Sequence, residues 1–354
     1  FYSIESSESE IIRNPLSCAI KRKNIEILKI LLEFKETDVN IILSNKLGPY
    51  LFIRSKIKSA FRQETKHESK SKSESESESE SESESESESE SESESESESE
   101  SESDSGTKKT NSDEEGNYSI LHFVIDFDNL EIFKLLLANQ KVDVNIRQIF
   151  TRRETFYYTK YDHSILTYAF ENRKFDFVKI LLSHPNVDVN SPSIITSMKT
   201  KNGWDYSEVT VNEETLLYQS IKENNKEIFQ LLLSRPDIDI NSASIYKIDK
   251  EYSSSRTSIY YKYDLALFKS LSNDNLEYFI ALISHPKIDI NSKYIYKDSS
   301  NCFNYETSAL EIAIKKENEE IVQLLLEHEE IDVNYKKICE KNESISYFPI
   351  LHSA

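Results

Sequence analysis

The chain has 354 residues, of which 37% are hydrophobic, and a formal net charge of −20. Residues 73–104 alternate serine with an acidic residue and hold 16 carboxylates and no basic residue, so the other 322 residues carry a net charge of only −4. Binding to nucleic acid is not expected, because it requires a concentrated basic face. A membrane span is not expected either, since no apolar run approaches the roughly 18 residues that one needs.

The three cysteines, Cys18, Cys302 and Cys339, are odd in number and far apart. They do not form the pattern of a disulfide framework or of a zinc ribbon, and they favour a reducing compartment. We therefore expect an intracellular, cytoplasmic protein. The first residue is Phe1 rather than Met, which predicts that the sequence is a segment of a longer chain.

One pattern recurs six times from the N-terminal end onwards. Each copy has a leucine, a small or modest residue three positions later, an acidic residue seven positions after that, an aliphatic run and a closing Asp-Val/Ile-Asn triplet. The triplets are Asp38–Asn40, Asp143–Asn145, Asp188–Asn190, Asp239–Asn241, Asp289–Asn291 and Asp332–Asn334. Six ungapped matches over 27 residues each predict a repeat architecture, in which neighbouring copies share one hydrophobic core.

Within each copy the spacing predicts two short antiparallel helices. The leucine and the small residue share one side of the first helix because they are three positions apart. The acidic residue lies in the first turn of the second helix, where the N-terminus favours negative charge. Between the helices we expect asparagine in a left-handed turn position. The residues at this position are Asn24, Asn129, Asn225, Asn275 and Asn318, with Lys174 in the third copy.

The segments between copies predict long β-hairpins that project from one edge of the helical stack. They comprise residues 146–163, 191–214, 242–264 and 292–307. Residues 193–200 and 205–211 flank Asn202-Gly203, which is a strong hairpin signal. Residues 149–151 and 155–158 indicate two further arms around a polar tip.

The insertion at residues 41–118 is the longest and contains the serine–glutamate tract at 73–104. Its first part, residues 41–61, resembles one arm of a hairpin. The tract has no apolar face and is expected to stay solvated and disordered. Its serines have acids one and three places downstream, which resembles sites for acidophilic kinases, and phosphorylation would add negative charge. The candidate phosphorylation sites are Ser73, Ser75, Ser77 and Ser79. A repeat expansion that is merely tolerated remains the alternative.

The copies resemble ankyrin repeats. Asn14-Pro15-Leu16 and Ser119-Ile120-Leu121-His122 match the family's opening element, Glu320–Leu326 matches its second helix, and Asp332–Asn334 matches its closing turn. The triplets and long insertions are similar to divergent arrays expanded in some protists. The resemblance implies an all-α solenoid of helix-loop-helix repeats with long β-hairpin insertions and one disordered acidic loop. The chain departs from the family in lacking the turn glycines and in repeat spacings of 43 to 105 residues, against about 33.

The expected organisation has four parts. Residues 1–40 hold the end of a preceding hairpin and the first repeat, and residues 41–118 form the insertion with its disordered tract. Residues 119–348 hold five repeats with long hairpins, and residues 349–354 begin a truncated further repeat.

For function, the resemblance implies a non-catalytic scaffold for protein–protein interactions, acting as a monomeric array with a protein partner. Repeat positions account for five of the seven histidines, and the sequence has no Gly-rich phosphate loop, HExxH motif or nucleophile elbow. We therefore expect no enzyme activity, cofactor or metal. Two alternatives remain open: a phosphorylatable polyanionic tether for basic proteins or divalent cations, and a substrate-selecting region of a larger protein whose enzyme domain lies outside this segment.

Tyrosine is concentrated outside the repeats: only Tyr168, Tyr218 and Tyr278 lie inside them, and the other 17 of the 20 tyrosines lie outside. Tyrosine and tryptophan bring large contact area at low entropy cost and are typical of binding surfaces. Alternatively, these rings pack on one another across strands. Both interpretations stay open. The candidate partner-binding residues are Tyr157, Tyr158, Trp204, Tyr206, Tyr260 and Tyr261.

Overall fold

Six helix pairs and twelve strands make up the part of the chain that the structure, a computed structural model, describes. That part comprises residues 14–45, 113–154, 156–200, 206–252, 257–272, 276–299, 303–334, 336–341 and 344–349. The serine–glutamate tract, with Ser73, Ser75, Ser77 and Ser79, lies outside the described residues, as do Trp204 and residues 1–13 and 350–354. Pro349 is the last residue of a strand.

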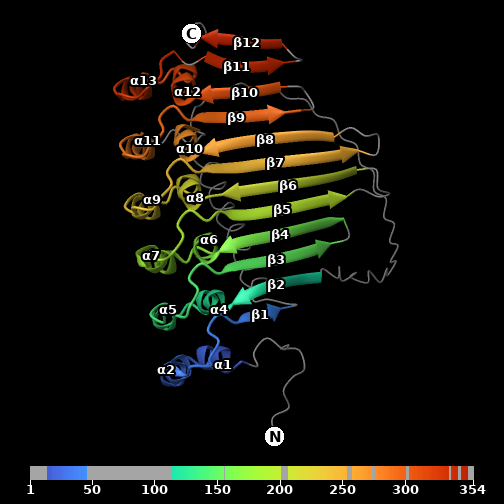
Figure 1. Cartoon of the computed structure of the whole chain (residues 1–354), viewed down its shortest axis with the longest axis vertical. Coiled ribbons are helices and arrows are strands. Elements are labelled where there is room, and N and C mark those ends of the chain that lie inside the picture. The colour runs from blue at the N-terminus through green and yellow to red at the C-terminus, as the bar shows by residue number, and fades with distance from the viewer. Residues whose placement is uncertain are drawn as a thin grey trace, which may run out of the picture. The chain divides into compact units, whose positions relative to one another are not determined.

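Each repeat folds as two short antiparallel helices. The first helices are α1 (Pro15–Lys21), α4 (Ile120–Asp126), α6 (Ile165–Glu171), α8 (Leu216–Lys222), α10 (Ala266–Ser272) and α12 (Ala309–Lys315). The second helices are α2 (Ile25–Glu33), α5 (Leu130–Leu137), α7 (Phe175–Ser183), α9 (Lys226–Leu233), α11 (Leu276–Ile283) and α13 (Glu319–Leu326). Figure 1 shows the second helices as an outer column, with the first helices between that column and the strands. None of the described helices is long and apolar enough to cross a membrane.

Side-chain caps set where the helices begin. Ser119 precedes α4 and accepts the N–H of His122, and Ser164, Thr215 and Ser308 do the same for α6, α8 and α12. The second helices α2, α5, α9 and α13 begin after an asparagine: Asn129 Oδ1, for example, accepts the N–H of Ile132 at 3.0 Å. An oxygen-bearing side chain with extended backbone is the favoured N-cap, because it satisfies an N–H that has no partner inside the helix.

The expected left-handed role is therefore wrong for Asn24, Asn129, Asn225 and Asn318, while Asn275 lies outside the described residues. Asn129 has φ −112°, whereas the residue before it, Asp128, has φ +55°. Asparagine suits both positions, and here the need for a cap decides which one it takes. The left-handed residues are Lys23, Asp128, Arg173, Asn224 and Glu317, with φ between 53° and 58°. Lys174, which replaces asparagine before α7, makes no capping hydrogen bond.

The shared leucine and small residue of the first helices form the core, as their spacing predicted. Leu121 and Leu166 are 1% exposed, and Ala169 and Ser220 have no exposed surface. Small side chains at these points let the first helices of neighbouring repeats approach closely. Aromatic rings join some of the second helices: the centroids of Phe133 in α5 and Phe177 in α7 are 4.9 Å apart. Each helix pair thus buries much of its apolar surface against the neighbouring pairs, as in other repeat stacks.

The closing triplet links each repeat to the next by hydrogen bonds. In the third repeat, Asp188 Oδ1 accepts the N–H of Asn190 at 3.0 Å, which closes a local turn. Asn190 Nδ2 donates to the carbonyl oxygen of Asp237 in the fourth repeat, and Asn190 Oδ1 accepts the N–H of Asp239, both at 2.8 Å. The same two bonds extend from Asn40, Asn145, Asn241 and Asn291. We call these five contacts the asparagine clasps.

The strands follow one another in chain order and pair antiparallel throughout. They are β1 (Ile42–Asn45), β2 (Asp113–Ser119), β3 (Arg147–Glu154), β4 (Tyr157–Ser164), β5 (Ser193–Thr200), β6 (Tyr206–Glu214), β7 (Ala243–Tyr252), β8 (Thr257–Leu265), β9 (Lys293–Asp298), β10 (Phe303–Ser308), β11 (Lys336–Lys341) and β12 (Ser344–Pro349). The hairpin arm predicted at 193–200 coincides with β5. The arms predicted at 149–151 and 155–158 are wrong in register, because Phe150 lies opposite Tyr161 and the tip falls between Glu154 and Tyr157.

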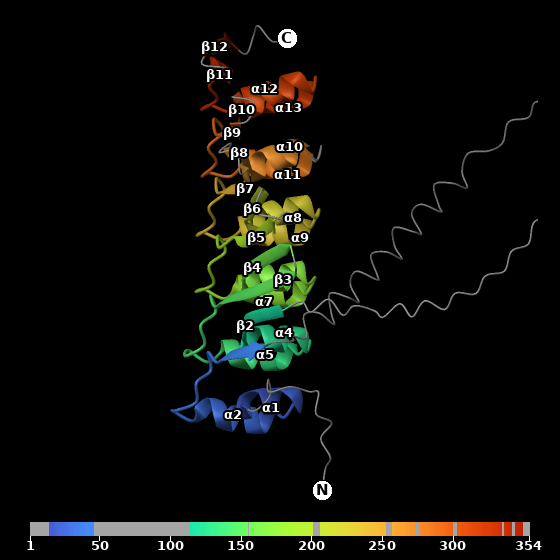
Figure 2. The same ribbon diagram turned by 90° about the vertical axis from the view of Figure 1, so that its right-hand side faces the viewer.

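The expected all-α class is wrong, because the hairpins join into one sheet of twelve strands. Neighbouring hairpins pair with each other, as β4 with β5 through Asp162 opposite Ile194. The reason is a match of two spacings. Packed helices lie about 8–10 Å apart, and two strands occupy about 9.6 Å, so stacking the helix pairs places successive hairpins within hydrogen-bonding reach. Figure 2 shows the resulting parallel stacks of helices and strands.

The two ends of the long insertion belong to the same sheet. Strand β1 follows the first repeat and pairs with β2, which precedes the second repeat, with Ile42 opposite Ser119. Strand β2 in turn pairs with β3. The insertion therefore leaves and re-enters the sheet in the position that a hairpin occupies between other repeats.

Candidate partner-binding site between the sheet and the first helices

Alternation along the strands gives the sheet two faces with different surroundings. One face packs against the first helices: the hydroxyl of Tyr218 in α8 donates to Asp264 of β8 at 2.9 Å. Likewise, the rings of Phe268 in α10 and Tyr294 in β9 are 5.9 Å apart. We call this side the inner face, and the opposite side, which carries Tyr261, the outer face.

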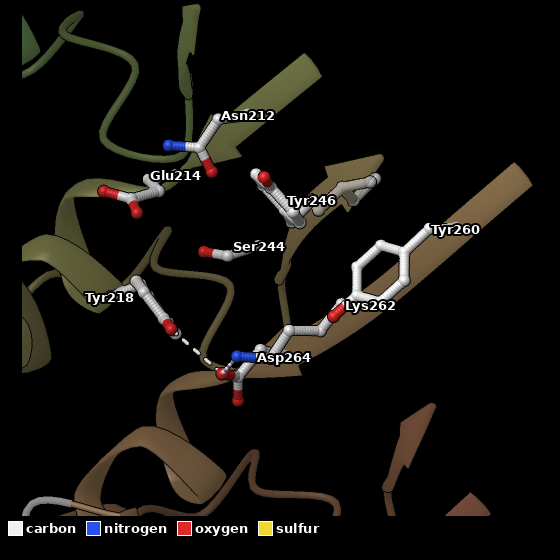
Figure 3. A pocket seen from close by; sticks show the side chains of 9 residues that line it. Asn212, Glu214, Tyr218, Ser244, Tyr246, Tyr260, Lys262 and Asp264 are labelled. Atoms are coloured by element: carbon white, nitrogen blue, oxygen red, sulfur yellow. Dashed lines mark hydrogen bonds and ion pairs between the residues drawn. The ribbon is translucent and has the colours of Figure 1, made fainter. Parts of the chain in front are cut away.

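A pocket of about 320 Å³ lies where the inner face meets α8 (Figure 3). We call it the junction pocket. It is lined by Asn212, Glu214, Tyr218, Ser244, Ile245, Tyr246, Tyr260, Lys262 and Asp264. Apart from Ile245, the strand residues in this set lie on the inner face, since register places Asn212 opposite Tyr246 and Tyr246 opposite Lys262. Strands β6, β7 and β8 and helix α8 thus build the pocket together.

The deepest part of the junction pocket holds two hydrogen-bonding atoms without partners. Asp264 is 7% exposed, and its Oδ2 accepts from Tyr218 and lies 3.0 Å from Lys262 Nζ. Its other oxygen, Oδ1, is buried and makes no hydrogen bond. The hydroxyl of Ser244, a residue that is 5% exposed, is in the same situation. Buried polar groups are normally paired, so two orphans in one pocket indicate an incomplete hydrogen-bonding set.

Tyrosine rings form the side of the junction pocket that faces away from α8. Tyr246 and Tyr260 have centroids 5.8 Å apart in an edge-to-face arrangement, and Tyr296 lies 5.0 Å beyond Tyr260. Burial, followed by the neighbouring tyrosines, raises the pKa of Tyr260. Burial and the charge of Asp264 also raise the pKa of Tyr218. Both phenols therefore stay protonated at neutral pH and act as hydrogen-bond donors.

The charged groups of the junction pocket sum to −1, from Glu214, Asp264 and Lys262. From outside the lining set, Lys222 Nζ reaches the two carboxylate oxygens of Glu214 at 2.7 and 2.9 Å. Of the three charged groups, Asp264 therefore is the one with a carboxylate oxygen that is both buried and unpartnered. The pocket combines acceptor oxygens with aromatic rings. It can therefore accept hydrogen bonds from a donor group of a ligand while the rings contact the apolar part of the same ligand.

The structure separates the six candidate residues that the sequence indicated. Tyr260 lines the junction pocket, whereas its neighbour Tyr261 lies on the outer face, stacked on Tyr263 with centroids 5.9 Å apart. Tyr157 and Tyr158 are at the far end of β4 on opposite faces, and Tyr157 is 49% exposed.

The side chains of the remaining two candidates, Tyr206 and Trp204, are not described by the structure. Tyr206 begins β6 opposite Tyr252, and its side chain is not among those described, while Trp204 lies outside the described residues. The structure therefore brings only Tyr260 into the pocket. A role of the six residues in partner binding stays a prediction.

Most of the pocket was missed by sequence reasoning, which selected tyrosines by their number and not by their side of the strand. The missed residues are Asn212, Glu214, Tyr218, Ser244, Tyr246, Lys262 and Asp264. A usable signal was present. Counting back in twos from Asp264, the second residue before α10, gives Lys262 and Tyr260, all on the inner face. Tyr218 was set aside as a core residue of its repeat.

The histidines of the described residues have structural roles. His184, His285 and His328 follow second helices, and each Nδ1 accepts the N–H two residues further on, at 3.2–3.4 Å. Burial lowers the pKa of His122 to about 3, so its ring stays neutral. His163, for which the sequence offered no partner, lies 2.9 Å from Ser193, which in turn donates to Glu171. No cluster of potential metal ligands occurs among the residues searched, which are the described ones.

Comparison with known proteins locates one recognised unit. Residues 305–338 match the family model for the ankyrin repeat. This segment runs from within β10 through α12 and α13 into β11, and therefore includes the sixth closing triplet. No curated protein matches the chain.

Proposed function

We propose that the chain is a divergent ankyrin array, of the kind expanded in some protists, that binds a protein partner without catalysis. The ankyrin match at residues 305–338 supports this proposal. The five other repeats have the same helix pair and buried leucine, and the asparagine clasps join all six in sequence. The cysteine usage favours a reducing, cytoplasmic setting for this interaction.

The observation that carries the proposal is the junction pocket. Its orphan acceptors, Asp264 Oδ1 and Ser244 Oγ, lie in the same pocket as the half-buried tyrosines of the inner face. Tyrosine-lined concave surfaces with a few buried polar groups are typical of recognition sites. A volume of about 320 Å³ suits a side chain that projects from a partner. We assign the inner face around β6–β8 as the partner-binding surface.

Adjacent tyrosines provide a matched test. Tyr260→Ala removes an aromatic wall of the junction pocket, whereas Tyr261→Ala removes the same side chain from the next position on the outer face. Proteins retained from an extract of the source cells would be quantified for the wild-type chain and for both variants, and thermal melting would verify that both variants are folded. A well-packed tyrosine at an interface contributes about 2 kcal/mol or more, so we expect retention of the partner to fall at least tenfold with Tyr260→Ala only.

The same experiment can refute the assignment. If partners bind equally to both folded variants, or if Tyr261→Ala has the larger effect, the inner face is not the binding surface.

A further inference from the structure

We propose that the junction pocket is specific for an arginine side chain of the partner protein, a proposal that rests on the protein-binding function above. The guanidinium group would donate hydrogen bonds to Asp264 Oδ1 and Ser244 Oγ. The rings of Tyr246 and Tyr260 would cover its methylene stem and one planar face. Figure 3 shows these four side chains around one opening, with Tyr260 on the other side of it from Tyr218.

The unused acceptors indicate a ligand that donates hydrogen bonds. Asp264 is already bonded through Oδ2 to Tyr218 and Lys262, and these contacts orient its carboxylate, while its buried Oδ1 makes no hydrogen bond. A carboxylate has about four lone-pair sites, so a third donor can be accommodated. A buried acceptor without a partner destabilises the folded protein, and a ligand that donates a hydrogen bond to it removes this penalty.

The chemistry favours arginine over lysine. Guanidinium is planar, is weakly hydrated, and presents several N–H donors in a fixed fork, so it can engage a carboxylate and a hydroxyl together while stacking on an aromatic ring. An ammonium ion is a point charge, and Lys262 already provides one beside Asp264 at 3.0 Å. A second ammonium at the same carboxylate would repel Lys262 without gaining a stacking surface, whereas guanidinium gains both hydrogen bonds and ring contact.

The surrounding charges permit a cation. The lining carries Glu214 and Asp264 against Lys262, and Lys222 is held by Glu214 outside the lining. An entering cation would bring the charge of the lining set from −1 to zero. An acidic or phosphorylated side chain would instead place a negative charge against the buried oxygen of Asp264, which is unfavourable at short range.

The test uses libraries of short random peptides in which the central residue is fixed as arginine, lysine, citrulline, glutamine or glutamate. The intact chain would be screened against each library, together with Tyr260→Ala, Asp264→Asn and Ser244→Ala. Asp249→Asn is the matched control, since Asp249 is also an aspartate of this sheet paired with a lysine, Lys247 at 2.6 Å, but lies on the outer face. Circular dichroism would establish that each variant is folded.

We expect the arginine library to bind about 10- to 100-fold better than the citrulline library, because a hydrogen bond between charged groups typically raises the affinity by a factor of this size. Asp264→Asn should remove most of that preference, Ser244→Ala part of it, and Asp249→Asn none. Binding that depends on Tyr260 but shows no preference for arginine, or prefers lysine, would overturn the arginine assignment and leave the proposed function standing. If none of the binding depends on Tyr260, both proposals fail. If Asp264→Asn does not fold, Ser244→Ala still tests the proposal. An unchanged preference for arginine in Ser244→Ala would contradict the proposed hydrogen bond from guanidinium to Ser244 Oγ.

Discussion

The asparagine clasps allow the coupling between neighbouring repeats to be measured at a single residue. Asn190→Ala removes both hydrogen bonds between the third and fourth repeats, namely the one from Nδ2 to the carbonyl of Asp237 and the one from the N–H of Asp239 to Oδ1, each 2.8 Å long. The bond from the N–H of residue 190 to Asp188 uses the backbone and is retained. The change therefore leaves the local turn intact and weakens the contact between two repeats.

The expected loss of stability follows from the number and exposure of these bonds. A typical intramolecular hydrogen bond contributes about 0.5–1.5 kcal/mol net, so two contribute about 1–3 kcal/mol. Asn190 is half-buried and its partners Asp237 and Asp239 are exposed, so water partly replaces the lost bonds. We therefore expect about 1–2 kcal/mol. The stability of a repeat stack includes a separate free-energy contribution from each interface between neighbouring repeats. Weakening one interface should therefore also reduce the cooperativity of unfolding.

The assay is urea denaturation of the intact chain, followed by circular dichroism and by hydrogen exchange of the amides in α7 and α9. Asn334→Ala is the control, because the described residues give Asn334 its bond to Asp332 but no clasp to a further repeat. If Asn190→Ala and Asn334→Ala lower the free energy of unfolding equally, or if Asn190→Ala changes it by less than about 0.3 kcal/mol, the clasps do not couple the repeats.

Three further substitutions test the local structure. Glu317 has φ +53°, so Glu317→Gly should raise the free energy of unfolding by up to about 1 kcal/mol, whereas Gln323→Gly at an exposed position inside α13 should lower it by about 1 kcal/mol; urea titration of both variants decides, and a loss at Glu317 contradicts the argument. Lys174→Asn should supply the N-cap hydrogen bond that α7 lacks, which is worth about 0.5–2 kcal/mol. The ion pair that it removes, between Lys174 and Asp128, is worth less than about 1 kcal/mol. We therefore expect a higher melting temperature, and a lower one would contradict this account. Burial raises the pKa of Asp126 to about 7, despite its hydrogen bond from a tyrosine, so the native state holds a proton that the unfolded state releases above about pH 4. Stability should thus fall as pH rises from about 4 to 7, and Asp126→Asn should remove this fall in melts at pH 5 and 8.

The helix pairs could be predicted because their signals are local. A leucine and a small residue three positions apart define one helix, and an acidic residue followed by aliphatic residues defines the next. The sheet could not be predicted in the same way. Pairing between β4 and β5 depends on the distance between repeats in space, and no pattern within either hairpin states that distance. The left-handed residues gave a signal only in part, since Asp128 and Asn224 are residue types that favour positive φ, whereas Lys23 and Glu317 are not.

The binding site was only partly accessible to sequence reasoning for a related reason. Counting tyrosines identifies strands rich in aromatic residues, but Tyr260 and Tyr261 are adjacent and face opposite sides. Which side is inner depends on where the strand joins its helix, and the position of Asp264 before α10 supplies that reference. The opposing residues Tyr246 and Asn212 come from other strands, so they could be assigned only once the register was known.

The division between shared and variable positions explains how one stack can carry different sites. The leucine of each first helix is the same in all six repeats, while the residue after it varies among Ser17, His122, Thr167, Tyr218, Phe268 and Glu311, all of them buried. In the last three repeats this residue contacts the base of a strand: Tyr218 bonds Asp264, Phe268 packs on Tyr294, and Glu311 accepts from Thr307 at 2.8 Å. Because the shared positions and the clasps hold the repeats together, this variable position can change the chemistry of the junction between helix and sheet without altering the stacking. Recognition is therefore expected to differ from repeat to repeat along the inner face, and the unpaired acceptors beside Tyr218 make its repeat the first place to look for a partner.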